Sequence, residues 1–305
     1  MIAEAYGLRG RVGIALGSGA ARGFAHIGVM RALREVGIRP EVVCGTSMGA
    51  IVGAAVAADH LDPFEAWARG LEWRQLAGYF DVTLRGGLIK ARKLFEFIDQ
   101  ALPQQRIEEL PRPFAAVGTD LANGQEVWMR EGPLTEALRA TVALPGLITP
   151  ARWQGRWLVD GGLVNPVPVS LCRALGADSV IAVDLNTTLL GRRFQNETRS
   201  APEPSQDRGR DETSFFSEIA DQLRERFGLD AENAELPTLY EVAANAVNIM
   251  KVRIGRSRMA GDPPELLITP RMADFGILDF DRAGEAIEEG EAATHRVLQN
   301  HDRSD

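Results

Sequence analysis

The sequence predicts an α/β fold in which a parallel or mixed sheet is covered by helices on both faces. Two observations favour this fold class. Short β-type runs alternate with helical stretches from residue 11 to about residue 185, and 45% of the 305 residues are hydrophobic. That fraction is typical of a globular protein and suffices to bury a full core. Strands that alternate with helices are characteristic of a sheet with helices on both sides.

The individual elements follow from local patterns. Strands are expected where short apolar runs lie between turn residues. These runs are Arg11–Leu16, Glu41–Cys44, Phe114–Gly118, Glu126–Met129, Arg156–Asp160, Ser179–Asp184 and Glu265–Thr269. Helices are expected where apolar residues recur at helical spacing. These stretches are Ala21–Val36, Met48–Ala58, Thr135–Val142, Val169–Leu175, Leu239–Ile254 and Asp281–Leu298. Gly37 and Pro145 are natural stops after two of these helices.

The composition changes at Gly191. Residues 192–212 are polar and nearly free of aliphatic side chains, which predicts a surface loop. An amphipathic helix with a narrow apolar stripe follows: Phe215, Ile219, Leu223 and Phe227. The pattern is open between a helix packed on its own domain, a lid, a membrane contact and a partner helix. With no repeat and no second fold signature, we expect one domain, with a core of 11–190 and 238–299 and an insertion at about 191–237.

Charge and composition exclude several classes of protein. The 42 Asp and Glu residues outnumber the 34 Lys and Arg residues, and the net charge of −8 disfavours a nucleic-acid partner. The longest apolar stretch, Ala50–Ala58, is too short to span a membrane. The N-terminus lacks the pattern of a signal peptide. We therefore expect a cytoplasmic protein, with peripheral contact at the inner membrane surface left open. Cys44 and Cys172 have no metal-type spacing and are expected to be buried thiols rather than a disulfide. No metal or cofactor is expected.

The strongest chemical signal is Gly45-Thr46-Ser47-Met48-Gly49. It follows a β-type run and precedes a helix of small residues, which is the context that a nucleophile elbow requires. Glycines on both sides of the serine relieve crowding around a strained turn. The N-terminus of the following helix favours developing negative charge. This pattern predicts that Ser47 is a nucleophile.

A second glycine-rich element, Gly17-Ser18-Gly19-Ala20-Ala21-Arg22-Gly23, lies between the first strand and the first helix. Such a loop can present backbone N–H groups to an anion. A dinucleotide fingerprint would need glycine where Arg22 stands, and a P-loop would need a Gly-Lys-Ser/Thr ending. In a serine hydrolase the loop would supply the donors of an oxyanion hole. A plain structural turn is the alternative.

The third element is Asp160-Gly161-Gly162, which closes a predicted strand. An aspartate at a strand end has an accessible carboxylate at the edge where open α/β sheets place their sites. The alternative is a turn-forming Asp-Gly pair.

A serine nucleophile needs an adjacent base. The chain has four histidines, and none of them lies in the loop after a strand from which a triad histidine usually reaches the serine: His26, His60, His295 and His301. An α/β-hydrolase would also place more of its sheet before the nucleophile than 46 residues allow. A dyad of Ser47 and Asp160 is therefore the economical prediction.

Four ordered blocks carry a resemblance to a known family: GSGAARGFAHIGVMRAL, GTSMGA, ATVALPGLITP and DGGLVNPVPV. In this order and spacing they resemble the patatin-like phospholipases, in particular the bacterial branch related to neuropathy target esterase. The resemblance runs from about Val12 to Leu185 and resumes at ITPRMADFGILDFDRAGEAIEEG. It implies a three-layer α/β/α sandwich with a mostly parallel central sheet.

The resemblance also implies a Ser–Asp dyad and hydrolysis of acyl esters in phospholipids, lysophospholipids or simpler lipids. By position, Ser47 would be the nucleophile and Asp160 the proton acceptor, and the N–H groups of Gly19 and Ala20 would form the oxyanion hole. Arg22 matches the basic residue of the family's loop. Ser18 and Ala20 replace two glycines that the family often has there. An acyltransferase with the same dyad, or a non-catalytic lipid- or partner-binding regulatory protein, are the alternatives.

Overall fold

The computed structural model describes residues 2–71, 95, 106–187 and 239–302. The chain divides into two units, residues 1–189 with 248–305 and residues 190–247. Of the second unit, only the first turns of one long helix are described. The predicted surface loop and the amphipathic stripe both fall outside the described residues, and the single-domain organisation with an insertion stays a prediction.

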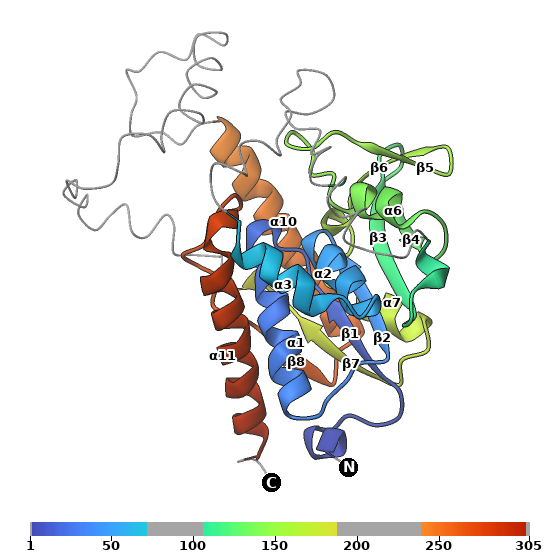
Figure 1. Cartoon of the computed structure of the whole chain (residues 1–305). Helices are drawn as coiled ribbons and strands as arrows, with labels where there is room; N and C mark the ends of the chain where they lie inside the picture. Colours follow the sequence, from blue (N-terminus) through green and yellow to red (C-terminus); the bar gives the residue numbers. More distant parts are fainter. Residues whose placement is uncertain (1, 72–94, 96–105, 188–238, 303–305) are drawn as a thin grey trace, which may run out of the picture. The chain divides into compact units, whose positions relative to one another are not determined.

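The first unit is built on one eight-stranded sheet (Figure 1). Its strands are β1 (Val12–Leu16), β2 (Val42–Thr46), β3 (Phe114–Asp120), β4 (Glu126–Met129), β5 (Ala151–Trp153), β6 (Arg156–Asp160), β7 (Ser179–Val183) and β8 (Leu266–Ile268). Their order is β5-β6-β3-β2-β1-β7-β8, and β4 pairs with the opposite edge of β3. Neighbouring pairs among β3, β2, β1, β7 and β8 are parallel. The pairs β3–β4, β3–β6 and β5–β6 are antiparallel, so the sheet is mixed.

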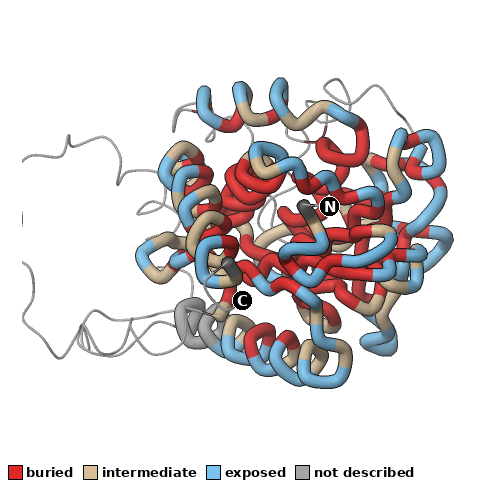
Figure 2. The backbone as a smooth tube through the Cα atoms, turned by 90° about the horizontal axis from the view of Figure 1, so that it is seen from below, coloured by how far each residue is buried: buried red, intermediate tan, exposed pale blue. Residues whose placement is uncertain are grey.

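Helices cover both faces of this sheet and complete three layers. They are α1 (Ala25–Glu35), α2 (Met48–Ala57), α3 (Leu61–Arg69), α6 (Leu134–Thr141), α7 (Val169–Ala174), α10 (Leu239–Gly261) and α11 (Ala283–Asp302). Alternate side chains of β1 enter different cores. Ile14 and Leu16 pack with α1, α2, α6 and α11, whereas Ala15 packs with α7. Because both faces are covered, the central strands are continuous apolar runs, and Figure 2 shows them buried at the centre of the fold.

Most predicted elements are present, and the differences have local causes. The sequence missed β5, whose three residues are too short to give a pattern, and α3. The predicted helix from Ala21 begins with a 3₁₀ turn, Ala20–Phe24, before α1. Helix α10 continues past its predicted end at Ile254 to Gly261. Past Ile254, the partly buried Met259 packs on the core beside α7, and this contact helps to offset the cost of about 1 kcal/mol for Gly255 in a helix.

The two cysteines lie in the layer between the sheet and α7. Cys44 of β2 and Cys172 of α7 are both buried, free thiols. Burial raises the pKa of the Cys44 thiol, and its contact with Cys172 raises it further. The Cys44 thiol therefore stays protonated, and both buried side chains contribute to the packing of this layer. Within the described ranges, no helix combines the length and the apolar character that a membrane crossing requires.

Candidate active site

Ser47 alone forms the turn between β2 and α2. The strand ends at Thr46, the helix begins at Met48, and Ser47 has φ 56° and ψ −129°. A non-glycine residue in such a conformation costs about 1–3 kcal/mol and persists only where its surroundings hold it. Its N–H donates to Oγ1 of Thr141 at 2.9 Å, and its carbonyl accepts the N–H of Ala50 at 2.8 Å. The sequence folds here into a strained elbow.

The glycines that flank this elbow provide space. A Cβ at Gly45 would lie 2.5 Å from the backbone nitrogen of Ala50, and a Cβ at Gly49 would lie 2.5 Å from the carbonyl oxygen of Gly17. Neither glycine has a positive φ. Both positions therefore exclude larger residues because the turn packs tightly against its own helix and against the loop after β1.

Asp160 reaches Ser47 through the pairing pattern of β3. On one edge of β3, the pairing with β2 ends where Thr46 lies opposite Val117. The pairing with β6 begins at the next residue of β3, where Asp160 lies opposite Gly118. Since β2 runs parallel to β3 and β6 runs antiparallel, their C-terminal ends meet on the same edge. The serine after β2 and the aspartate that ends β6 are thus adjacent although 113 residues separate them.

The two side chains form a buried hydrogen bond. Oγ of Ser47 donates to Oδ2 of Asp160 at 2.7 Å, and the residues are only 7% and 2% exposed. The other carboxylate oxygen, Oδ1, accepts the N–H of Gly162 at 2.7 Å. The backbone of Asp160 is fixed as well, because its carbonyl accepts Oγ1–H of Thr119 at 2.9 Å. One oxygen of the carboxylate is therefore held by the backbone while the other faces the serine.

Gly161 and Gly162 form a short 3₁₀ turn after Asp160. Neither glycine has a positive φ, so the turn does not require glycine for conformational reasons. A Cβ at Gly161 would overlap the carbonyl oxygen of Val117, and a Cβ at Gly162 would lie 2.7 Å from Oδ1 of Asp160. Asp160 therefore has two roles. Its Oδ1 caps the short turn by accepting the N–H of Gly162, and its Oδ2 accepts the hydrogen bond from Ser47.

The glycine-rich loop after β1 leaves two N–H groups available. The N–H groups of Gly17, Ser18 and Ala21 donate to carbonyls of Val183, Pro166 and Ile277. Among the described residues, no acceptor is bonded to the N–H groups of Gly19 and Ala20.

Two side chains fix the shape of this loop. Arg22 is buried and donates from Nε to the carbonyl of Gly19 at 3.0 Å. Asn186 donates from Nδ2 to the carbonyl of Ser18 at 2.8 Å. Ala20 has φ 49°, a conformation that glycine adopts more readily than alanine. The two side-chain hydrogen bonds hold the loop in this conformation.

His26 supports the loop and does not contact the serine. Its Nε2 lies 2.7 Å from the carbonyl oxygen of Gly17, which can only accept, so Nε2 carries the proton. Burial lowers the pKa of His26 to about 4, and the ring is neutral at neutral pH. His60 contacts the carbonyl of Ala58, and His295 lies 3.7 Å from Glu35. None of the four histidines, all of them in described segments, hydrogen-bonds to Ser47.

Sequence reasoning missed one charged residue at this site. Lys251 of α10 is buried, and its Nζ lies 3.4 Å from Oδ1 of Asp160. No motif surrounds it. The available signal was the scarcity of lysine, because only Lys90, Lys93 and Lys251 occur among the 34 basic residues.

The site combines an α/β sheet, a strained serine elbow, an adjacent aspartate and a loop in which two N–H groups have no acceptor among the described residues. These features place the chain in the class of α/β proteins with a nucleophile-elbow site. Residues 14–173 match the family model of patatin-like phospholipases. An uncharacterized NTE family protein of Mycobacterium tuberculosis is 34% identical, with 95% of this chain and 91% of that protein aligned. The chain belongs to the patatin-like phospholipase family.

Two more distant similarities accompany this match. The lysophospholipase NTE1 of Coccidioides immitis is 29% identical over 92% of this chain, which corresponds to 17% of that protein. The crystal structure of VipD from Legionella pneumophila aligns with a TM-score of 0.46 and 15% identity, covering 95% of this chain and 66% of VipD.

Proposed function

We propose that the chain is a serine hydrolase that cleaves acyl esters of lipids through Ser47 and Asp160. The observation that carries this proposal is the buried 2.7 Å hydrogen bond from the elbow serine to a strand-end carboxylate. Membership in the patatin-like phospholipase family and a lysophospholipase among the relatives support a lipid substrate. The activity would be of the phospholipase A, lysophospholipase or carboxylesterase type.

The reaction begins with proton transfer from Oγ of Ser47 to Oδ2 of Asp160. Oγ attacks the ester carbonyl, and the N–H groups of Gly19 and Ala20 donate to the oxyanion. Each such donor contributes about 3 kcal/mol to stabilising the transition state. The N-terminus of α2 adds a favourable dipole at the same end of the sheet. Asp160 then returns the proton to the leaving alcohol, and an acyl-enzyme remains.

Hydrolysis of the acyl-enzyme uses the same groups in reverse. Asp160 accepts a proton from water, the resulting nucleophile attacks the acyl carbonyl, and Ser47 leaves as its hydroxyl form with the proton from Asp160. The fatty acid is released. No histidine takes part in this scheme, because none of the four hydrogen-bonds to Ser47.

A fluorophosphonate probe and an ester series test this proposal together. The wild-type protein should be labelled and Ser47→Ala should not. Esters of increasing acyl length, offered as monomers and as vesicles, should be hydrolysed by the wild type only, and added lysolipid or alcohol acceptors would reveal transfer instead of hydrolysis. Equal labelling of both proteins, or inertness toward every ester, would contradict the proposal.

A further inference from the structure

The buried lysine beside Asp160 is a feature that the Ser47–Asp160 mechanism leaves unused. The Lys251 side chain is 10% exposed, and its Nζ lies 3.4 Å from Oδ1 of Asp160. A Cβ at Gly162 would lie 3.0 Å from Cε of Lys251 and 2.7 Å from Oδ1. Glycine at position 162 therefore leaves the space in which the lysine stem and the carboxylate meet.

The choice of lysine at this position is unusual for this chain. Lysine makes up 3 of the 34 basic residues, and the others are arginines. A lysine ammonium is a compact charge on a slim stem, whereas a guanidinium is a broad planar fork. The narrow space beside Gly162 fits the former better, so the residue type agrees with the geometry.

The positive charge of Lys251 compensates the negative charge of the buried Asp160 carboxylate. A carboxylate that is 2% exposed has lost most of its hydration, and a buried charge is stable only when it is paired and hydrogen-bonded. Ser47 and Gly162 give Asp160 uncharged donors. In the part of the chain that the structure describes, Lys251 is the one cation that forms an ion pair with Asp160.

The contacts also divide the carboxylate between two tasks. Oδ1 receives the N–H of Gly162 and the ammonium of Lys251, and Oδ2 receives Oγ–H of Ser47. With Oδ1 held from two directions, rotation of the carboxylate would break two interactions. Lys251 thereby helps to keep Oδ2 directed at the serine.

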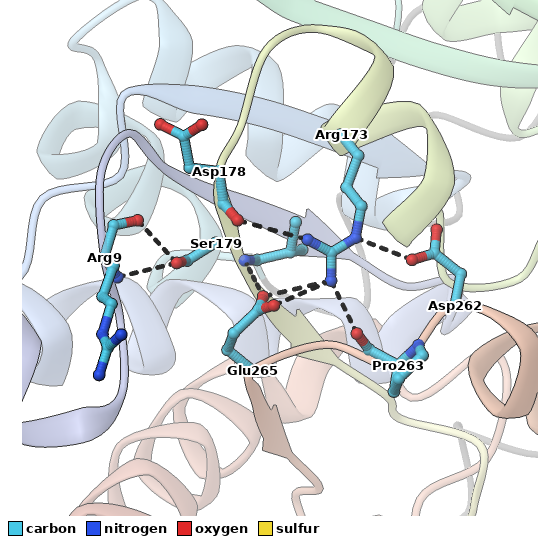
Figure 3. Close-up of polar contacts among 8 residues, drawn as sticks. Arg9, Arg173, Asp178, Ser179, Asp262, Pro263 and Glu265 are labelled. Carbon is cyan, nitrogen blue, oxygen red and sulfur yellow. Dashed lines mark hydrogen bonds and ion pairs between the residues drawn. The ribbon is translucent and has the colours of Figure 1, made fainter.

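Two polar anchors hold the part of α10 that carries Lys251. Arg258 of α10 pairs with Glu126 of β4 at 2.7 Å. Just after the helix, Asp262 accepts from Nε of Arg173 at 2.8 Å, and the carbonyl of Pro263 accepts from the same guanidinium at 2.7 Å (Figure 3). These contacts hold the C-terminal part of α10 against β4 and α7, and they thereby position Lys251 beside Asp160.

We propose that Lys251 is a positioning residue of the site, whose ammonium pairs with the buried Asp160 carboxylate and keeps it oriented toward Ser47. This inference rests on the proposed function, and it adds a third residue to the predicted dyad. It requires no proton transfer to or from Lys251.

The test compares Lys251→Met with the control Arg253→Met, which removes a charge from an exposed position of the same helix. Two substrates are used, neutral p-nitrophenyl butyrate and phosphate-bearing lysophosphatidylcholine. Turnover is expressed per serine labelled by fluorophosphonate, so that loss of folded protein is separated from loss of rate.

Lys251→Met should lower kcat about 100-fold on both substrates with KM nearly unchanged. Arg253→Met should match the wild type.

Two results would overturn the proposal: a kcat of Lys251→Met equal to that of the wild type, or a loss of activity confined to the phosphate-bearing substrate. The second result would assign Lys251 to substrate binding. Failure of the proposed function is a different outcome, in which the wild type itself neither hydrolyses esters nor is labelled at Ser47.

Discussion

The two halves of the site are built in different ways. The serine half is local, because Gly45, Ser47 and Gly49 shape the elbow within five residues. The aspartate half is assembled from distant segments: β6 places Asp160 beside Ser47 across 113 residues, and Lys251 contacts it across 91. Local sequence therefore determines the geometry of the nucleophile, whereas tertiary packing determines the environment of the base. Substitutions in each half should separate these two contributions.

The largest effect is expected in the local half. Ser47→Ala removes the attacking oxygen and should lower ester hydrolysis by about 10⁴-fold or more. The fold should be retained, because alanine keeps the Cβ of serine and the elbow is held by hydrogen bonds of its backbone. Activity measurements together with thermal unfolding check this, and a variant that hydrolyses esters at the wild-type rate would remove Ser47 from its role.

In the aspartate half, Gly162→Ala tests whether catalysis depends on the exact positions of Asp160 and Lys251. The added Cβ would lie 2.7 Å from Oδ1 of Asp160 and 3.0 Å from Cε of Lys251, so one of the two must move. A displacement of this size should lower kcat about 10-fold to 100-fold. Gly261→Ala is the control, since a Cβ there meets nothing within 4 Å. Equal kcat values for the two variants would show that the contact between Asp160 and Lys251 tolerates displacement.

His26 should make stability depend on pH. The pKa of this buried ring is lowered from 6.5 to about 4 in the folded protein, so the unfolded chain binds the proton first as the pH falls. The free energy of unfolding should therefore decrease on acidification, by about 2 kcal/mol from this residue between pH 7.5 and pH 5. Urea unfolding of the wild type and of His26→Gln at both pH values measures the difference. Identical losses in the two proteins would show that His26 does not titrate in this way.

Thr141→Val should have the smallest effect. It removes the Oγ1 that accepts the N–H of the strained Ser47 and leaves a buried donor without this partner. The free energy of unfolding should fall by about 1–3 kcal/mol, and kcat should fall modestly because the elbow loses one of its restraints. Unfolding and kinetics of the same preparation provide the comparison. An unchanged stability would indicate that the helix α2 alone holds the elbow.

These differences explain how far the sequence alone could lead. The central strands were predictable because both of their faces are buried and they appear as continuous apolar runs. The elbow was predictable because its crowding requires glycine on both sides of Ser47. Strand β5 was not predictable, because its three residues form a strand only through their pairing with β6. The place of Lys251 in the site was not predictable either. Its contact with Asp160 forms only when α10 packs on the sheet, and the sequence around it contains no motif.

The most direct test of the account is the kcat of Asp160→Asn, measured on a monomeric ester per mole of folded protein. The amide keeps the shape of the side chain but cannot take the proton of Ser47, so the account predicts a fall in kcat of about 10³-fold or more at an unchanged fold. A variant that retains near-wild-type kcat would contradict it, because another group would then have to serve as the base.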